Sequence, residues 1–137
     1  MDIRELPLEI YIDGASRGNP GRSGAGVLIK DRNGNIYKIK RNLGILTNNQ
    51  AEYEALITAL QSAKELKRNH IKIYTDSSLL ANQINGNWRV RDSKIQVLYK
   101  KARELIEEFE QIEIEYIPRE LNREADRLAN EAIDEYS

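Results

Sequence analysis

Cysteine is absent from this chain of 137 residues, and histidine occurs once, as His70. Without thiols, the chain can form no disulfide bond, no cysteine nucleophile and no zinc site built from cysteine. A single histidine excludes any mechanism that requires two. No apolar run approaches the roughly 20 residues of a membrane-spanning helix, and residues 1–9 carry four charges instead of the apolar segment of a secretory signal. We therefore expect a cytoplasmic protein that does not bind a membrane.

The net charge is close to zero, at −1, because 21 basic residues are balanced by 22 acidic ones. The two signs are nevertheless separated along the chain. Residues 1–103 contain 18 basic and 10 acidic residues, whereas residues 104–137 contain 3 and 12. Such asymmetry indicates a surface for nucleic acid. The composition is that of a globular protein, and the length predicts a single domain over residues 1–137.

Hydrophobic periodicity predicts five strands and four helices. The strands are expected at residues 8–13, 26–30, 35–43, 71–76 and 112–117, and the helices at residues 49–67, 77–84, 93–109 and 122–135. Residues 14–24 are rich in glycine, serine and asparagine and are predicted to form a loop. Asn33-Gly34 predicts a hairpin turn, and Asn122 is expected to cap the last helix. This order of elements predicts a mixed α/β sheet with helices packed on it.

Two of the predicted strands end in the same phrase, Ile-Tyr-x-Asp, at residues 10–13 and 73–76. If these strands are parallel neighbours, Asp13 and Asp76 emerge at the carboxyl edge of the sheet, where open α/β proteins bind ligands. The alternative is that aspartate merely favours strand ends and turns. The repetition of the phrase is the reason to consider a shared site.

Two further acidic residues lie on or beside apolar helix faces. Glu52 shares a face with Leu56 and Leu60, and Asp126 is followed at i+3 by Ala129. A carboxylate among apolar neighbours requires a partner, because burying an unpaired charge is costly. Alternatively, both residues are solvated and interact only with the dipole of a helix start.

Together, the four acids predict a site for a hard divalent cation. Oxygen ligands suit Mg²⁺ or Mn²⁺. Two such ions about 3.5–4 Å apart would hold both the attacking and the leaving oxygen of a phosphodiester. Without cations the acids would repel one another, so metal binding should stabilise the fold.

Four blocks of sequence resemble those of type 1 ribonucleases H, in the same order and with the same spacing. The blocks are residues 13–21 (DGASRGNPG), 47–52 (TNNQAE), 74–77 (YTDS) and 122–129 (NREADRLA). The resemblance covers nearly the whole chain. It implies a ribonuclease H-like fold with a five-stranded mixed sheet. In that fold, strands 1–3 are antiparallel, strands 4 and 5 run parallel to strand 1, and about four helices pack on both faces.

The resemblance also implies an activity, which is endonucleolytic cleavage of the RNA strand of an RNA–DNA hybrid by a two-metal-ion mechanism. The products would carry 5′-phosphate and 3′-hydroxyl ends. Mg²⁺ would be the cofactor, with Mn²⁺ as a possible substitute, and the protein would be a monomer without an obligate protein partner. The catalytic and metal-binding carboxylates would be Asp13, Glu52, Asp76 and Asp126, the four acids identified above.

Family resemblance suggests substrate contacts as well. Asn19, Asn48 and Asn49 are expected to touch backbone and sugar groups in the minor groove, where the 2′-hydroxyl distinguishes RNA. Thr47 resembles the hydroxyl of a pocket that holds a DNA phosphate. Ordinary turn and cap chemistry is the alternative explanation for the asparagines.

The chain departs from longer family members in two places. It lacks their basic helix-loop insertion, since only residues 85–92 separate two helices, and the loop at residues 118–121 contains no histidine. We hypothesise that Arg119 partly replaces that histidine through its charge, in proton transfer or product release.

A basic run over residues 85–103 could bind the hybrid in place of the missing insertion. Trp88, Arg89 and Arg91 are the expected contacts, because an aromatic ring can stack on a sugar while arginines pair with phosphates. The alternative is a solvated helix face with one buried aromatic residue.

Two other functions stay open at this point. The chain could be a non-catalytic module that binds hybrids. It could also bind nucleotides through Gly21-x-x-Gly24-x-Gly26, although this spacing differs from the dinucleotide-binding motif and leads into a strand instead of a helix.

Overall fold

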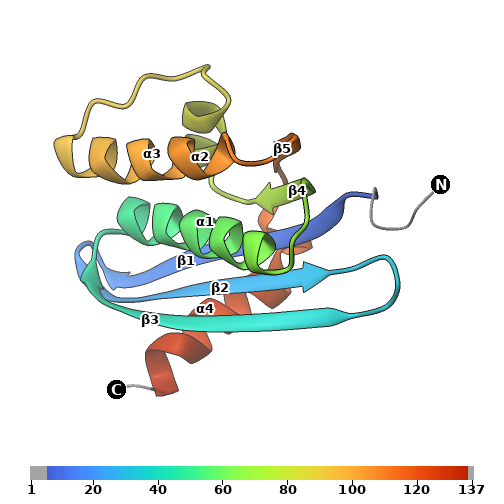
Figure 1. Ribbon diagram of the computed structural model, residues 1–137. Helices are drawn as coiled ribbons and strands as arrows, with labels where there is room; N and C mark the ends of the chain where they lie inside the picture. The colour runs from blue at the N-terminus through green and yellow to red at the C-terminus, as the bar shows by residue number, and fades with distance from the viewer. Residues whose placement is uncertain (1–5, 136–137) are drawn as a thin grey trace.

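The computed structural model describes residues 6–135 (Figure 1). Its elements are β1 (Leu8–Gly18), β2 (Gly21–Lys30), β3 (Ile36–Leu46), α1 (Asn48–Glu65), β4 (His70–Thr75), α2 (Ser78–Ile84), α3 (Ser93–Ile106), β5 (Gln111–Tyr116), the short 3₁₀ helix η2 (Arg119–Leu121) and α4 (Arg123–Glu135). Within these residues, the five predicted strands and four predicted helices are all present. None of the helices between residues 6 and 135 has the length and hydrophobicity needed to cross a lipid bilayer.

The five strands form one mixed sheet in the order β3-β2-β1-β4-β5. Strand β2 pairs antiparallel with both β1 and β3, whereas β4 lies parallel to β1 and to β5. In the parallel register, Ile12 of β1 lies opposite Thr75 of β4. The next residue on each strand is an aspartate, so the register brings Asp13 and Asp76 to the same edge, as the repeated phrase predicted.

Helices cover both faces of the sheet, which confirms the predicted architecture (Figure 1). Helix α1 packs on β1 and β2, and α3 packs on the outer side of α1. The core on this side includes Ile10, Ile12, Leu56 and Leu60, all fully buried. Helix α4 covers the other face over β1, β2 and β3.

The predicted loop at residues 14–24 is wrong. Strand β1 continues to Gly18 and β2 already begins at Gly21, so only Asn19 and Pro20 form the turn between them. The glycine content suggested a loop, but some of these glycines lie within strands, where they allow a helix to pack closely.

The glycine motif of β2 lies directly beneath α4. A Cβ atom on Gly24 or Gly26 would lie 2.4 Å or 2.3 Å from a backbone carbonyl oxygen of that helix. Both glycines therefore allow the helix to approach the sheet, and neither belongs to a loop that could wrap around a phosphate. This packing removes the basis for the nucleotide-binding alternative.

Candidate active site

Four carboxylates meet at the carboxyl end of the parallel strands. Asp13 lies in β1, Asp76 follows β4, Glu52 is near the start of α1 and Asp126 is near the start of α4. All four line one cleft of about 400 Å³. One carboxylate oxygen from each of Asp13, Glu52 and Asp76 lies within 4.8 Å of the others. The structure therefore brings together the four acids that the sequence singled out.

Glu52 reaches this cleft because α1 lies directly on β1. A Cβ atom on Gly14 would be 2.2 Å from the carbonyl carbon of Ala51, so only glycine permits this approach. The Gly14 N–H donates a hydrogen bond to Glu52 Oε1 at 2.5 Å. With only 5% of its surface exposed, Glu52 is not the solvated helix-start acid of the alternative interpretation.

Crowding of the carboxylates perturbs their ionisation. Burial, then the negative charges of Glu52 and Asp76 and a hydrogen bond with Asp126, raise the pKa of Asp13. The pKa of Glu52 is also raised, chiefly by burial and also by Asp76 and Asp126, although the Gly14 N–H opposes the shift. Divalent cations would compensate this excess of negative charge, and an all-carboxylate donor set fits hard ions of the Mg²⁺ type.

Asp126 is held by a chain of polar contacts that sequence reasoning missed. Asn130 donates a hydrogen bond from Nδ2 to Asp126 Oδ1 at 3.3 Å. Arg17 in β1 donates to Asn130 Oδ1 at 3.3 Å and forms an ion pair with Asp134. The i+4 spacing from Asp126 to Asn130 was a usable signal, since it places both residues on one helix face. Nothing in the sequence pairs Arg17 with either residue.

Asn122 lies at the predicted N-cap position of α4, since its carbonyl oxygen accepts the Asp126 N–H at 3.1 Å, but its side chain makes no capping hydrogen bond. The side chain is 1% exposed and points into the protein. Its Nδ2 atom donates to the carbonyl oxygen of Ile12 at 2.8 Å and to Asp76 Oδ2 at 3.4 Å. These contacts turn the amide so that Nδ2 serves acceptors in β1 and at the end of β4, while Oδ1, the atom that would cap a helix, accepts no hydrogen bond from the described residues.

Arg119 is exposed and lies in η2, at the border of the carboxylate cleft. It also lines an adjoining hollow of about 320 Å³ together with Glu120, Arg123 and Asp126. The structure thus places the arginine of the short loop beside one of the four acids.

The expected minor-groove contacts gather at the tip of the β1–β2 hairpin and the start of α1. Asn19 Oδ1 accepts a hydrogen bond from the backbone N–H of Asn48 at 3.0 Å, and Asn49 is exposed in the same helical turn. Thr47 caps α1, because its hydroxyl oxygen accepts from the backbone N–H of Gln50 at 3.2 Å. Cap chemistry therefore explains Thr47 in part, while its hydroxyl hydrogen can still be donated to a phosphate.

The expected aromatic and basic contacts lie apart from the carboxylates. Trp88 is 49% exposed, and together with Arg89 it lines a hollow of about 610 Å³ between α2 and α3. Arg91 is exposed nearby. Gln83 anchors this segment, since its amide donates to the Arg89 carbonyl oxygen at 3.3 Å and accepts from the Tyr53 hydroxyl at 2.7 Å. Trp88 is therefore not the buried aromatic residue of the alternative interpretation.

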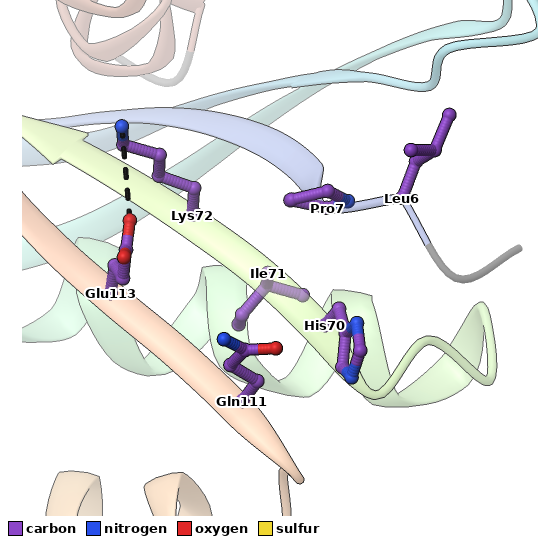
Figure 2. Close-up of a pocket in the computed structure, with 7 residues that line it drawn as sticks. All are labelled: Leu6, Pro7, His70, Ile71, Lys72, Gln111 and Glu113. Atoms are coloured by element: carbon purple, nitrogen blue, oxygen red, sulfur yellow. Dashed lines mark ion pairs between the residues drawn. The ribbon is translucent and has the colours of Figure 1, made fainter. Parts of the chain in front are cut away.

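A different hollow, of about 350 Å³, lies at the opposite, amino end of the parallel strands (Figure 2). The residues that line it are Leu6, Pro7, His70, Ile71, Lys72, Gln111 and Glu113. Glu113, the one acid among them, forms an ion pair with Lys72 at 3.7 Å. His70 begins β4 and so lies at the other end of that strand from Asp76, as predicted. This hollow offers no cluster of acids for a cation.

Comparison with known proteins gives this geometry a family. Residues 11–132 match the sequence family described as "Reverse transcriptase-like". The chain is 42% identical over 126 residues to Ribonuclease HI of Halobacterium salinarum, which covers 91% of this chain and 63% of that protein. The crystal structure of RNase H1 from the same archaeon has a TM-score of 0.90 and 40% identity, over 95% of this chain and 99% of that one. The chain belongs to the type 1 ribonuclease H family.

A second type 1 ribonuclease H of similar structure is LC11-RNase H1, whose crystal structure was determined in complex with an RNA/DNA hybrid. It has a TM-score of 0.88 and 36% identity, over 94% of this chain and 98% of that one. The chain described here spans only 63% of the length of the full Halobacterium protein.

Proposed function

We propose that this type 1 ribonuclease H is a metal-dependent endoribonuclease that hydrolyses the RNA strand of RNA–DNA hybrids. Its products would carry 5′-phosphate and 3′-hydroxyl ends. The observation that carries the proposal is the convergence of Asp13, Glu52, Asp76 and Asp126 in one cleft. A relative of the same fold that binds an RNA/DNA hybrid supports the choice of substrate.

Metal binding is the proposed task of the four carboxylates. Two Mg²⁺ ions, with Mn²⁺ as a substitute, would activate a water molecule for attack on the phosphodiester and neutralise the departing oxygen. Asp13 and Glu52 are suited to hold cations because they are buried and mutually repelled. The Gly14 N–H fixes the direction of the Glu52 carboxylate, so this ligand is positioned before any cation arrives.

Arg119 is proposed to act through its charge. A guanidinium group stays protonated at neutral pH, so it cannot serve as a general base. At the border between the cleft and the adjoining hollow, it can donate hydrogen bonds to a phosphate that enters or leaves. Its contribution would therefore be to orient the scissile phosphate and to draw the new 5′-phosphate away from the carboxylates.

Two surfaces beside the cleft would hold the hybrid. Asn48 lines the carboxylate cleft, Asn19 is hydrogen-bonded to it, and Asn49 is exposed in the same helical turn. Short polar side chains at this place suit contacts with 2′-hydroxyl groups in a wide minor groove. Thr47, in the same turn, would donate its hydroxyl to a DNA phosphate.

The second surface is formed by Trp88, Arg89 and Arg91. Neither arginine forms an ion pair with any residue between 6 and 135, so both charges can reach a phosphate. The exposed ring of Trp88 can stack on a sugar.

The protein is further proposed to act as a cytoplasmic monomer without an obligate protein partner. All four carboxylates come from one chain, so the cleft needs no second copy to be complete.

A nicking assay on a hybrid with a labelled RNA strand tests the proposal. With Mg²⁺ or Mn²⁺, the protein should cut internal RNA positions and leave the DNA strand intact. Asp13→Asn removes a ligand and should lower the rate by about 100-fold or more, because even residues that only orient metal ligands typically contribute 10–100-fold. Tight hybrid binding without cleavage in either metal would favour the non-catalytic binding module.

A further inference from the structure

Asn122 forms hydrogen bonds with Asp76, with Asp126 and with Ile12, the residue before Asp13. Its side-chain amide donates to the Ile12 carbonyl oxygen, one residue before Asp13, and to Asp76 Oδ2. Its backbone carbonyl oxygen accepts the Asp126 N–H at 3.1 Å, which is a first hydrogen bond of α4. One buried residue thus connects β1, the end of β4 and the start of α4.

These contacts constrain the distances between β1, the end of β4 and the start of α4. The two N–H groups of an amide diverge in a fixed planar geometry, so bonds to Ile12 and Asp76 set the spacing between these acceptors. The backbone bond then fixes where α4 begins, and with it the place of Asp126. Because Asn122 is 1% exposed, water cannot easily replace its amide if the side chain is lost.

The choice of asparagine fits a positioning role better than a cap or a general packing role. Its Oδ1 atom accepts no hydrogen bond from the described residues, so the contribution of the side chain comes from its N–H groups. Lysine or arginine would donate too, but would add a positive charge that competes with cations. Aspartate would add a fifth negative charge, and leucine, of similar size, would donate nothing.

We propose that Asn122 is a positioning residue that holds Asp76 and Asp126 against β1 at the spacing that divalent cations require. The inference rests on the proposed function, since it assumes that the four acids bind metal. It assigns to Asn122 no contact with substrate and no proton transfer.

The variant Asn122→Leu tests this, with Asn42→Leu as its control. Asn42 also ties a strand to α4, because its amide donates to the Ala132 carbonyl oxygen at 3.3 Å, but within residues 6–135 it forms no hydrogen bond with a carboxylate. Two quantities are measured in each variant: the Mg²⁺ or Mn²⁺ concentration that gives half of the maximal rise in Tm, and kcat and KM on a hybrid. The first readout needs no catalysis.

For Asn122→Leu, we expect the half-saturating metal concentration to rise by about 10- to 100-fold, as is typical when a residue that orients a metal ligand is lost. At limiting metal, kcat should fall, KM for the hybrid should stay within about twofold, and excess metal should restore part of kcat. Asn42→Leu should match the parent protein in metal response and kcat, whatever its effect on Tm in metal-free buffer.

Several results would overturn the inference. One is an Asn122→Leu protein whose metal response and kcat equal those of the parent, and another is a defect confined to KM. If Asn122→Leu does not fold, Asn122→Ala replaces it, and failure of both to fold would show that Asn122 holds the fold instead. A parent protein that neither binds metal nor cleaves contradicts the proposed function itself, whereas an unaffected variant of an active parent contradicts only the role of Asn122.

Discussion

The chemistry of Asp13 is determined by its neighbours. This carboxylate is 6% exposed, and its pKa is raised by burial and by the charges of Glu52 and Asp76. A group with a raised pKa holds a proton in the metal-free protein at a pH where an ordinary aspartate has lost it. A bound cation would displace that proton, so metal affinity should increase with pH.

The raised pKa values of Asp13 and Glu52 predict how stability depends on pH. In the unfolded chain both acids titrate near about 4, so above this pH the metal-free folded state binds more protons than the unfolded state. The free energy of unfolding of the metal-free protein should therefore fall progressively as the pH rises from about 4 through neutrality, because the two acids resist losing their protons in the folded state. Urea unfolding in EDTA at pH 5 and pH 8 measures the slope.

Asp13→Asn provides the comparison for this pH dependence. In EDTA the variant should lose less stability between the two pH values than the parent, and at pH 8 it should be the more stable protein by about 1 kcal/mol or more. Saturating Mg²⁺ should reverse that order, because only the parent keeps the full ligand set. Equal slopes for parent and variant in EDTA would mean that the carboxylates do not repel one another as described.

Arg119 supplies a second prediction for a single residue. Arg119→Ala should lower turnover of the hybrid by about tenfold, because it removes a charge-assisted donor from the border of the cleft. Arg119→Lys, which keeps the charge, should recover part of the rate. Arg127→Ala is the control, since Arg127 is exposed and pairs with Glu124 and Glu131 on the outer side of α4.

Steady-state kinetics on one hybrid, with the metal saturating, measures all three variants. If Arg119→Ala turned over at the parent rate while Glu52→Gln was inactive, the proposed role of Arg119 would have to be abandoned.

At the scale of elements, the site forms where two strands and two helices meet. The parallel register aligns the ends of β1 and β4, and glycines in β1 and β2 allow α1 and α4 to pack closely on the sheet. The segment between α2 and α3 is a separate element with a separate proposed task. It presents Trp88, Arg89 and Arg91 to solvent and is anchored from inside by Gln83. A contact surface of this kind should contribute to hybrid affinity without contributing to the chemical step.

The salt dependence of hybrid binding tests whether the segment between α2 and α3 contacts the hybrid. Replacement of both Arg89 and Arg91 by alanine should reduce the slope of log K against log[salt] by up to about 2, since each phosphate contact contributes about 0.9. Replacement of both Arg32 and Lys67, which lie towards the other end of the sheet, is the control and should leave the slope unchanged. An unchanged slope in the Arg89/Arg91 variant would place the binding surface elsewhere.

The sequence predicted the features that depend on local patterns and missed those that depend on contacts between distant segments. The repeated strand ending at Asp13 and Asp76 and the apolar stripe around Glu52 are local patterns, and the structure brings these residues together as expected. The extended hairpin over residues 14–24 was missed because glycines that admit a helix look the same as glycines that form a loop. The amide contacts of Asn122 were missed because its partners are distant in sequence.

At the scale of the whole molecule, the separation of charges along the chain is partly compensated by the fold. The acidic helix α4 packs on β3, where Lys38 pairs with Glu124 at 3.2 Å and Lys40 pairs with Glu131 at 3.7 Å. These pairs are exposed, so they contribute little to stability. They place basic groups of β3 beside two of the acids of α4. The basic residues around Trp88 lie on a different part of the surface and can attract a nucleic acid. The assignment of residues 1–137 to a single domain stays a prediction.

Hybrid cleavage by a matched pair of glutamate variants tests the central claim most directly. Glu52 lies in the carboxylate cleft, whereas Glu54, two residues later on the same helix, pairs with Arg41 at 3.1 Å. Glu52→Gln keeps an oxygen that can accept the Gly14 N–H, so the variant should fold while its Mg²⁺-dependent cleavage falls by about 100-fold or more. Glu54→Gln should cleave within about twofold of the parent, because Glu54 does not line the cleft. Equal cleavage by Glu52→Gln and the parent, at the same folded fraction, would contradict the claim that the four carboxylates form the active site.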